Sequence, residues 1–245
     1  MGIKNSIAKF LSLFGIGIYR INGSENSNSD LQVKPAATWK DFEIESPIKH
    51  NTPGRMDEFF SDRGMMEQYL GDERIKFYEN IVQLAKEKKI EIDGKDIADA
   101  GCGTGHLLKF FTMNFSPKTI SGMDFSNEAL KIARLTLSTG NFFIYDLYKK
   151  PDGKFDVLLC TEVLEHLQHP EYALSNLLQM MRMDAVCIIT VPNGRIDFYE
   201  GHINFWSPES WEIFITKNSR GFKTETGTLP DKKNNFAIIR SCTGR

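Results

Sequence analysis

The segment 99–105, DAGCGTG, places three glycines within five residues, directly after the short apolar run 96–100. A segment with so few side chains suits neither a core strand nor a helix. Without Cβ atoms, however, the backbone can adopt φ > 0 and approach a ligand closely. A strand that ends in an acid and leads through such a turn into a helix is typical of a nucleotide-binding βα unit. The segment therefore predicts an α/β fold with a ligand at this turn.

The hydrophobic pattern around the glycine turn alternates between strand and helix periods. The sequence predicts helices over 66–89, 106–115, 126–137 and 171–182, and strands over 96–100, 119–125, 141–147, 185–192, 222–229 and 235–242, with a further strand that begins at 155 and runs into a loop by 167. This alternation indicates βαβ units and a mostly parallel sheet. The short link 230–234 predicts that the sheet ends in an antiparallel hairpin.

Residues 1–65 differ in character from residues 66–245, which we predict to be the main domain. Residues 3–18 show helical spacing of apolar side chains, 22–30 form a polar linker, and 31–54 contain three prolines typical of an extended arm. The amphipathic helix could dock on its own domain, pair with a second copy in a homodimer, or make weak contact with a membrane surface.

Composition argues against several classes of partner. The net charge of −2 over 245 residues gives no long-range attraction to nucleic acid or to an anionic membrane. No apolar run approaches the roughly 20 residues of a transmembrane helix. The four cysteines are widely separated in the sequence, which indicates reduced thiols and favours a cytoplasmic location.

The glycine spacing also restricts the class of cofactor that the turn could bind. No Gly or Ala stands three residues after Gly103, so the dinucleotide pattern G-x-G-x-x-G is absent, and no Lys-Ser/Thr pair follows as in a P-loop. The pattern suggests a cofactor with ribose and adenine but no phosphate. On these residues, the chain resembles the class I S-adenosylmethionine-dependent methyltransferases over about 70–245.

This resemblance implies a Rossmann-like sheet of seven strands and assigns roles at the strand ends. The glycine turn would pass under the methionine part of S-adenosylmethionine, Asp124 would bind both ribose hydroxyls, Phe125 would lie against the adenine, and Asp146 would accept from its amino group. The residues expected to bind the cofactor are Asp99, Gly101, Cys102, Gly103, Gly105, Asp124, Phe125, Asp146, Leu147 and Thr161.

A second group of polar residues follows the strand that begins at 155. Glu162, Glu165 and His166 have the spacing i, i+3, i+4, which places them on one side of a helical turn. His202 lies in a loop after the next strand, at the same edge of the sheet. Together they offer an oxygen and nitrogen ligand set suitable for Mg²⁺, Mn²⁺ or iron.

The E-x-x-E-H pattern is similar to that of ubiquinone-biosynthesis O-methyltransferases and of small-RNA 2′-O-methyltransferases. The resemblance implies a metal that holds the acceptor and lowers the pKa of its hydroxyl. Two other interpretations remain. His166, with Glu165, acts as a catalytic base without a metal, or the helical turn that carries them has only a structural role.

The sequence therefore predicts O-methylation of a small polar acceptor. RNA 2′-O-methylation is the alternative, although the chain has no basic stripe. A third hypothesis is a non-enzymatic module that binds S-adenosylmethionine as a sensor.

Overall fold

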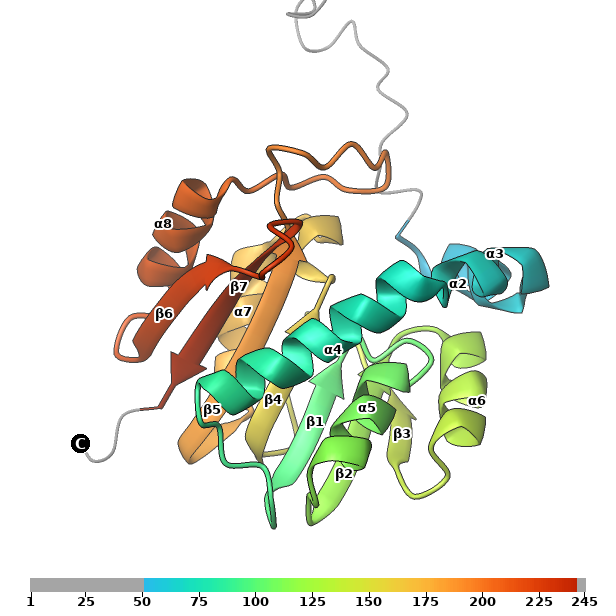
Figure 1. Cartoon of the computed structure of the whole chain (residues 1–245), viewed down its shortest axis with the longest axis horizontal. Coiled ribbons are helices and arrows are strands. Elements are labelled where there is room, and N and C mark those ends of the chain that lie inside the picture. The colour runs from blue at the N-terminus through green and yellow to red at the C-terminus, as the bar shows by residue number, and fades with distance from the viewer. Residues whose placement is uncertain (1–50, 242–245) are drawn as a thin grey trace, which may run out of the picture. The chain divides into compact units, whose positions relative to one another are not determined.

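Seven strands form one sheet at the centre of residues 51–241, the part of the chain that this computed structural model describes (Figure 1). The predicted helix 3–18, the linker 22–30 and most of the arm lie outside the described residues. In chain order the strands are β1 (Asp96–Ala100), β2 (Thr119–Asp124), β3 (Asn141–Ile144), β4 (Phe155–Thr161), β5 (Met181–Pro192), β6 (Lys223–Thr228) and β7 (Asn234–Arg240).

The spatial order of the strands is β3-β2-β1-β4-β5-β7-β6. Neighbours from β3 to β5 are parallel, whereas β7 is antiparallel both to β5 and to β6. The predicted mostly parallel sheet with a terminal hairpin is confirmed. The chain order reverses between β1 and β4, and ligands of such sheets bind at the carboxyl ends of the strands that flank this point.

Helices cover both faces of the sheet (Figure 1). α4 (Asp72–Glu87), α5 (His106–Asn114) and α6 (Asn127–Thr136) pack on one face, while α7 (Pro170–Gln179) and α8 (Pro208–Asn218) pack on the other. The two resulting core clusters contain the inward-facing side chains of opposite faces of β1, β4 and β5. Burial of both sheet faces explains why these strands have nearly continuous apolar sequences.

Two predicted helices differ in their bounds. The predicted helix 66–89 is two helices, α3 (Arg63–Tyr69) and α4, because Gly71 has an extended backbone and serves as the N-cap of α4. The predicted helix 171–182 ends at Gln179, because Met181 already belongs to β5 and pairs with Phe155 of β4.

Two helices were not predicted, although each carries an ordinary start signal. α2 (Pro53–Ser61) begins after the N-cap Thr52, and α8 begins after the N-cap Ser207, in both cases with proline in the first turn. The boundary expected between residues 65 and 66 falls inside α3.

Candidate active site

The glycine turn between β1 and α5 requires left-handed backbone at each of its three glycines. The φ angles of Gly101, Gly103 and Gly105 are 81°, 49° and 74°. A Cβ atom at Gly101 would overlap the Val163 side chain. The turn is held against β2, because the Gly101 and Cys102 N–H groups donate to the Met123 carbonyl over 2.7 and 2.9 Å. Glycine is therefore needed here for both conformation and space.

Two acids border the turn in a buried position. Asp99 is 1% exposed and its Oδ1 has no hydrogen-bond partner among the described residues. Burial raises the pKa of Asp99 to about 7, and the nearby charge of Asp124 adds to this effect. Asp124 accepts from Gly103 N–H through Oδ2 and from Ser126 N–H through Oδ1, each over 2.9 Å. The unpartnered oxygen of Asp99 is free for a donor from a ligand.

The other residues expected at the cofactor also lie at or just beyond the ends of their strands. Phe125 follows β2 and is partly buried, while Thr161 is the last residue of β4. Asp146 lies two residues beyond β3, and its Oδ1 accepts from Tyr148 N–H. Cys102 and Leu147 are buried. These residues lie at the carboxyl edge of the sheet, although β3 ends at Ile144, before the predicted end at 147, and their contact with the cofactor stays a prediction.

Helices α2 and α3 lie over this turn. A Cβ atom at Gly103 would lie 3.6 Å from Tyr69 Oη and 3.7 Å from Phe60 Cζ. From α2, Asp57 Oδ1 accepts from Ser126 Oγ over 2.6 Å and from Glu128 N–H over 3.1 Å. Asp57 therefore ties α2 to the N-terminus of α6, next to the acid expected at the ribose.

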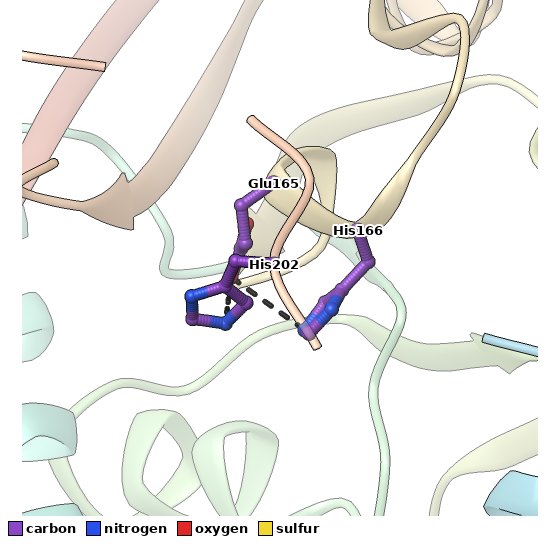
Figure 2. Close-up of side chains that lie close together, drawn as sticks. All are labelled: Glu165, His166 and His202. Carbon is purple, nitrogen blue, oxygen red and sulfur yellow. Dashed lines mark ion pairs between the residues drawn. The ribbon is translucent and has the colours of Figure 1, made fainter. Parts of the chain in front are cut away.

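A second polar cluster lies beyond the end of β4. Glu165, His166 and His202 each offer a ligand atom, and these atoms lie within 4.8 Å of one another (Figure 2). Glu165 Oε1 is 3.8 Å from His166 Nε2 and 3.9 Å from His202 Nε2. The Glu165 side chain is 0% exposed, and neither of its oxygens has a hydrogen-bond partner among the described residues. Such a carboxylate lacks the compensation that buried charges ordinarily have.

The Nδ1 atom of each histidine contacts a hydrogen-bonding partner outside the cluster, and the Nε2 atom of each histidine faces the Glu165 carboxylate. His166 Nδ1 lies 3.0 Å from the Gly201 carbonyl, and His202 Nδ1 lies 2.6 Å from Asp197 Oδ2. A carbonyl only accepts, so neutral His166 carries its proton on Nδ1 and presents a lone pair at Nε2. Burial lowers the pKa of His166 to about 4. Burial, followed by the charge of Glu162, raises the pKa of Glu165 well above its ordinary range.

Glu162, the fourth expected ligand, is not part of this group. It has φ of 55°, and the helical turn begins only at Leu164, so the predicted helical spacing with Glu165 does not exist. Its carboxylate accepts from Thr190 Oγ1 over 3.0 Å and from Asn234 Nδ2 over 2.9 Å. Glu162 thus connects the end of β4 to β5 and β7, and burial raises its pKa to about 7.

Asparagines join the loop that carries His202 to the turn that carries Glu165. Asn204 Nδ2 donates to the Leu167 carbonyl over 2.7 Å, and Asn204 N–H donates to the Glu165 carbonyl over 3.0 Å. Asn51 Nδ2 donates to the carbonyls of His166 and Gly201 over 3.1 and 3.2 Å. These bonds explain how residues some forty positions apart in the sequence form one cluster.

Arg74 of α4 is a further polar residue that the sequence analysis missed. Its guanidinium lies 4.5 Å over the Tyr69 ring, and it lines a cleft of about 480 Å³ together with Glu162 and Asn234. Burial alone lowers the pKa of Arg74, but the neighbouring tyrosines and glutamates outweigh it, so the side chain stays charged. Arg74 offsets part of the negative charge of the two glutamates.

The fold and the carboxyl edge of the sheet define the class of protein. The sheet is Rossmann-like, and the glycine turn after β1 contacts an acid at the end of β2. This is the arrangement of class I S-adenosylmethionine-dependent methyltransferases. Residues 70–217 match the methyltransferase domain family. The chain belongs to this family. Within the described residues, no helix is both long and apolar enough to span a membrane.

Named relatives agree with this assignment. The chain is 38% identical over 91 residues to a ubiquinone biosynthesis O-methyltransferase of Thiobacillus denitrificans, which covers 34% of this chain and 38% of the relative. It is 30% identical over 142 residues to a malonyl-[acyl-carrier protein] O-methyltransferase of Halalkalibacterium halodurans, covering 53% of this chain and 51% of that enzyme. The chain therefore aligns with about half or less of the length of either relative.

A solved structure shows the same fold. Magnesium protoporphyrin IX methyltransferase from Synechocystis PCC 6803 with bound S-adenosylmethionine superposes with a TM-score of 0.58 at 16% identity, covering 78% of this chain and 97% of that one.

Proposed function

We propose that this protein transfers a methyl group from S-adenosylmethionine to a hydroxyl of a small polar acceptor, assisted by a divalent metal ion. The observation that carries the metal is Glu165, a fully buried carboxylate with no partner among the described residues, beside two imidazole Nε2 atoms. The relatives named as O-methyltransferases support an oxygen atom as the methyl acceptor in general.

The donor set fits the metal. One carboxylate and two imidazoles suit Mn²⁺ or iron, and Mg²⁺ is also bound by few protein groups together with waters and substrate oxygens. When bound, the ion would lower the pKa of the acceptor hydroxyl. His166 fits the role of ligand better than that of free base, because a group with pKa of about 4 takes up little proton at neutral pH.

The remaining residues have positioning roles. The glycine turn, Asp99 and Asp124 would hold the cofactor, whose sulfonium and ammonium groups are cationic and therefore suit a carboxylate with a free oxygen. Methyl transfer is an in-line displacement, so the protein accelerates it mainly by orienting donor and acceptor. The cover formed by α2 and α3 would limit the access of water to the turn.

Chelation tests the metal-assisted reaction directly. Purified protein is incubated with S-adenosylmethionine and a panel of sugars, catechols and phosphorylated hydroxy compounds, and release of S-adenosylhomocysteine is measured. We expect EDTA to abolish turnover and added Mn²⁺ or Mg²⁺ to restore it. His166→Ala should lose at least 100-fold in rate, whereas His169→Ala, which changes an exposed histidine three residues away, serves as the matched control. Full turnover in excess EDTA would refute the metal.

The methyl acceptor, the cellular location and the assembly of the protein are also proposals. The acceptor is proposed to be a small molecule. Cys102, Cys160 and Cys187 are free, buried thiols, which is consistent with a reducing cytoplasm. Retardation of short RNA in a gel shift at moderate salt would instead favour RNA 2′-O-methylation. A homodimer or membrane contact through residues 3–18 remains a prediction, because those residues lie outside the described part of the chain.

A further inference from the structure

Asp197 is a largely buried acid beside the Glu165, His166 and His202 cluster, and it has no role in the reaction proposed above. Its Oδ2 lies 2.6 Å from His202 Nδ1, and the side chains of both residues are 11% exposed. It lies five residues before His202 on the loop after β5, outside the E-x-x-E-H pattern. An imidazole that binds a metal through one nitrogen is commonly held by a carboxylate at the other.

The backbone around Asp197 holds this geometry in place. Asp197 N–H donates to the Asn193 carbonyl over 3.1 Å, and Asp197 Oδ1 accepts from Tyr199 N–H over 3.2 Å. His202 N–H donates to the Tyr199 carbonyl over 3.0 Å. The acid and the histidine are therefore fixed by successive turns of one loop, and the side-chain bond closes that loop.

The two histidines of the cluster differ in the group that their Nδ1 atoms contact. His166 Nδ1 faces the neutral carbonyl of Gly201, whereas His202 Nδ1 faces a carboxylate. Near the cluster, Glu162 bonds to Thr190 and Asn234 and lies in the same cleft as Arg74. Glu165 and Asp197 are then the two carboxylates left next to the histidines, and when an ion holds both in the ionised form their two negative charges would balance a divalent cation.

We propose that Asp197 is the positioning residue of this centre: it holds His202 with its proton on Nδ1, so that Nε2 faces Glu165, and it supplies the second negative charge that retains a divalent cation. The inference rests on the metal-assisted reaction proposed above. Loss of an outer partner of this kind typically weakens metal binding by about 10- to 100-fold.

The first experiment needs no metal. Nitrogen-15 NMR of the metal-free full chain reports which imidazole nitrogen of His202 carries the proton. We expect the Nδ1–H form in the wild type and in Asp197→Asn, whose side-chain oxygen still accepts, and a mixture of tautomers in Asp197→Ala. A wild-type proton on Nε2, or an unchanged spectrum in Asp197→Ala, would overturn the positioning role.

The second experiment measures binding of Mn²⁺ by calorimetry. We expect Asp197→Ala to bind about 10- to 100-fold more weakly than wild type and Asp197→Asn to lose less. Glu200→Gln, which removes an exposed acid from the same loop, should match the wild type. Binding of S-adenosylhomocysteine checks that each variant is folded, and Asp197→Asn carries the test if Asp197→Ala fails this check.

The outcomes separate the two proposals. Wild-type binding of Mn²⁺ with equal affinity in Asp197→Ala would refute the inference and leave the metal-assisted reaction standing. Absence of Mn²⁺ binding by the wild type would refute the metal centre and with it the charge-balancing role of Asp197.

Discussion

Asp99 offers a sharp test of the site, because its replacement should change stability and binding in opposite directions. Its carboxyl group is buried at the end of β1, with one oxygen unpartnered among the described residues. A group of this kind destabilises the cofactor-free protein once it is ionised and becomes useful only when a cationic ligand arrives. Asp99→Asn keeps the shape and removes the charge.

The magnitude follows from the pKa of Asp99 in the two states. Burial raises it to about 7 in the folded protein, whereas in the unfolded chain it stays near 3.8. Between these values the folded state binds more protons, so the free energy of unfolding falls as pH rises from about 4 to about 7 and then stays level. A difference of about three pKa units corresponds to about 4 kcal/mol. Asp99→Asn should remove this loss, so the free energy of unfolding should rise by about 4 kcal/mol at pH 8 and change little near pH 4.

Urea unfolding at pH 4.5 and pH 8 without cofactor measures the stability, and calorimetry with S-adenosylhomocysteine at pH 8 measures binding. Asp152→Asn, which neutralises an exposed acid, is the matched control. We expect Asp99→Asn to be the more stable protein at pH 8 and the weaker binder, by about tenfold or more, since a charged hydrogen bond contributes about 1.5–3 kcal/mol. Equal stability at pH 8, or undiminished binding, would contradict the assignment of this acid to the cofactor.

Two further substitutions test the turn and its cover. Gly101→Ala should cost about 2–5 kcal/mol in urea unfolding, from left-handed backbone and overlap with Val163, and adding Val163→Ala should recover only the overlap. Asp57→Ala removes an acceptor at the start of α6 and should cost about 1 kcal/mol and speed release of S-adenosylhomocysteine in stopped flow. Glu58→Ala, an exposed neighbour on α2, should do neither; identical release rates in the two variants would show that α2 does not retain the cofactor.

The sequence predicted the sheet and the glycine turn because both depend on local pattern. Strand alternation and the three glycines are visible in consecutive residues, and β1 begins and ends as predicted. The spacing rule failed at Glu162, because it assumes continuous helix, and a single left-handed residue redirects the side chain toward Thr190 and Asn234. Asp197 could not be assigned from spacing, since its position beside His202 depends on how one irregular loop closes.

Within the described part of the chain, buried carboxylate oxygens without a hydrogen-bond partner belong to two residues, Asp99 and Glu165. Asp99 belongs to β1 and Glu165 follows β4, the two strands that flank the point where the strand order reverses. Each would be costly in a core built for stability alone, and each is of the type that a cation satisfies. One lies beside the glycine turn, where a sulfonium cofactor is expected, and the other beside two imidazoles suited to a divalent ion. We propose that two cationic ligands explain these two acids better than packing does, because in the described residues their buried oxygens have no hydrogen-bond partner and would gain one only when a ligand is bound.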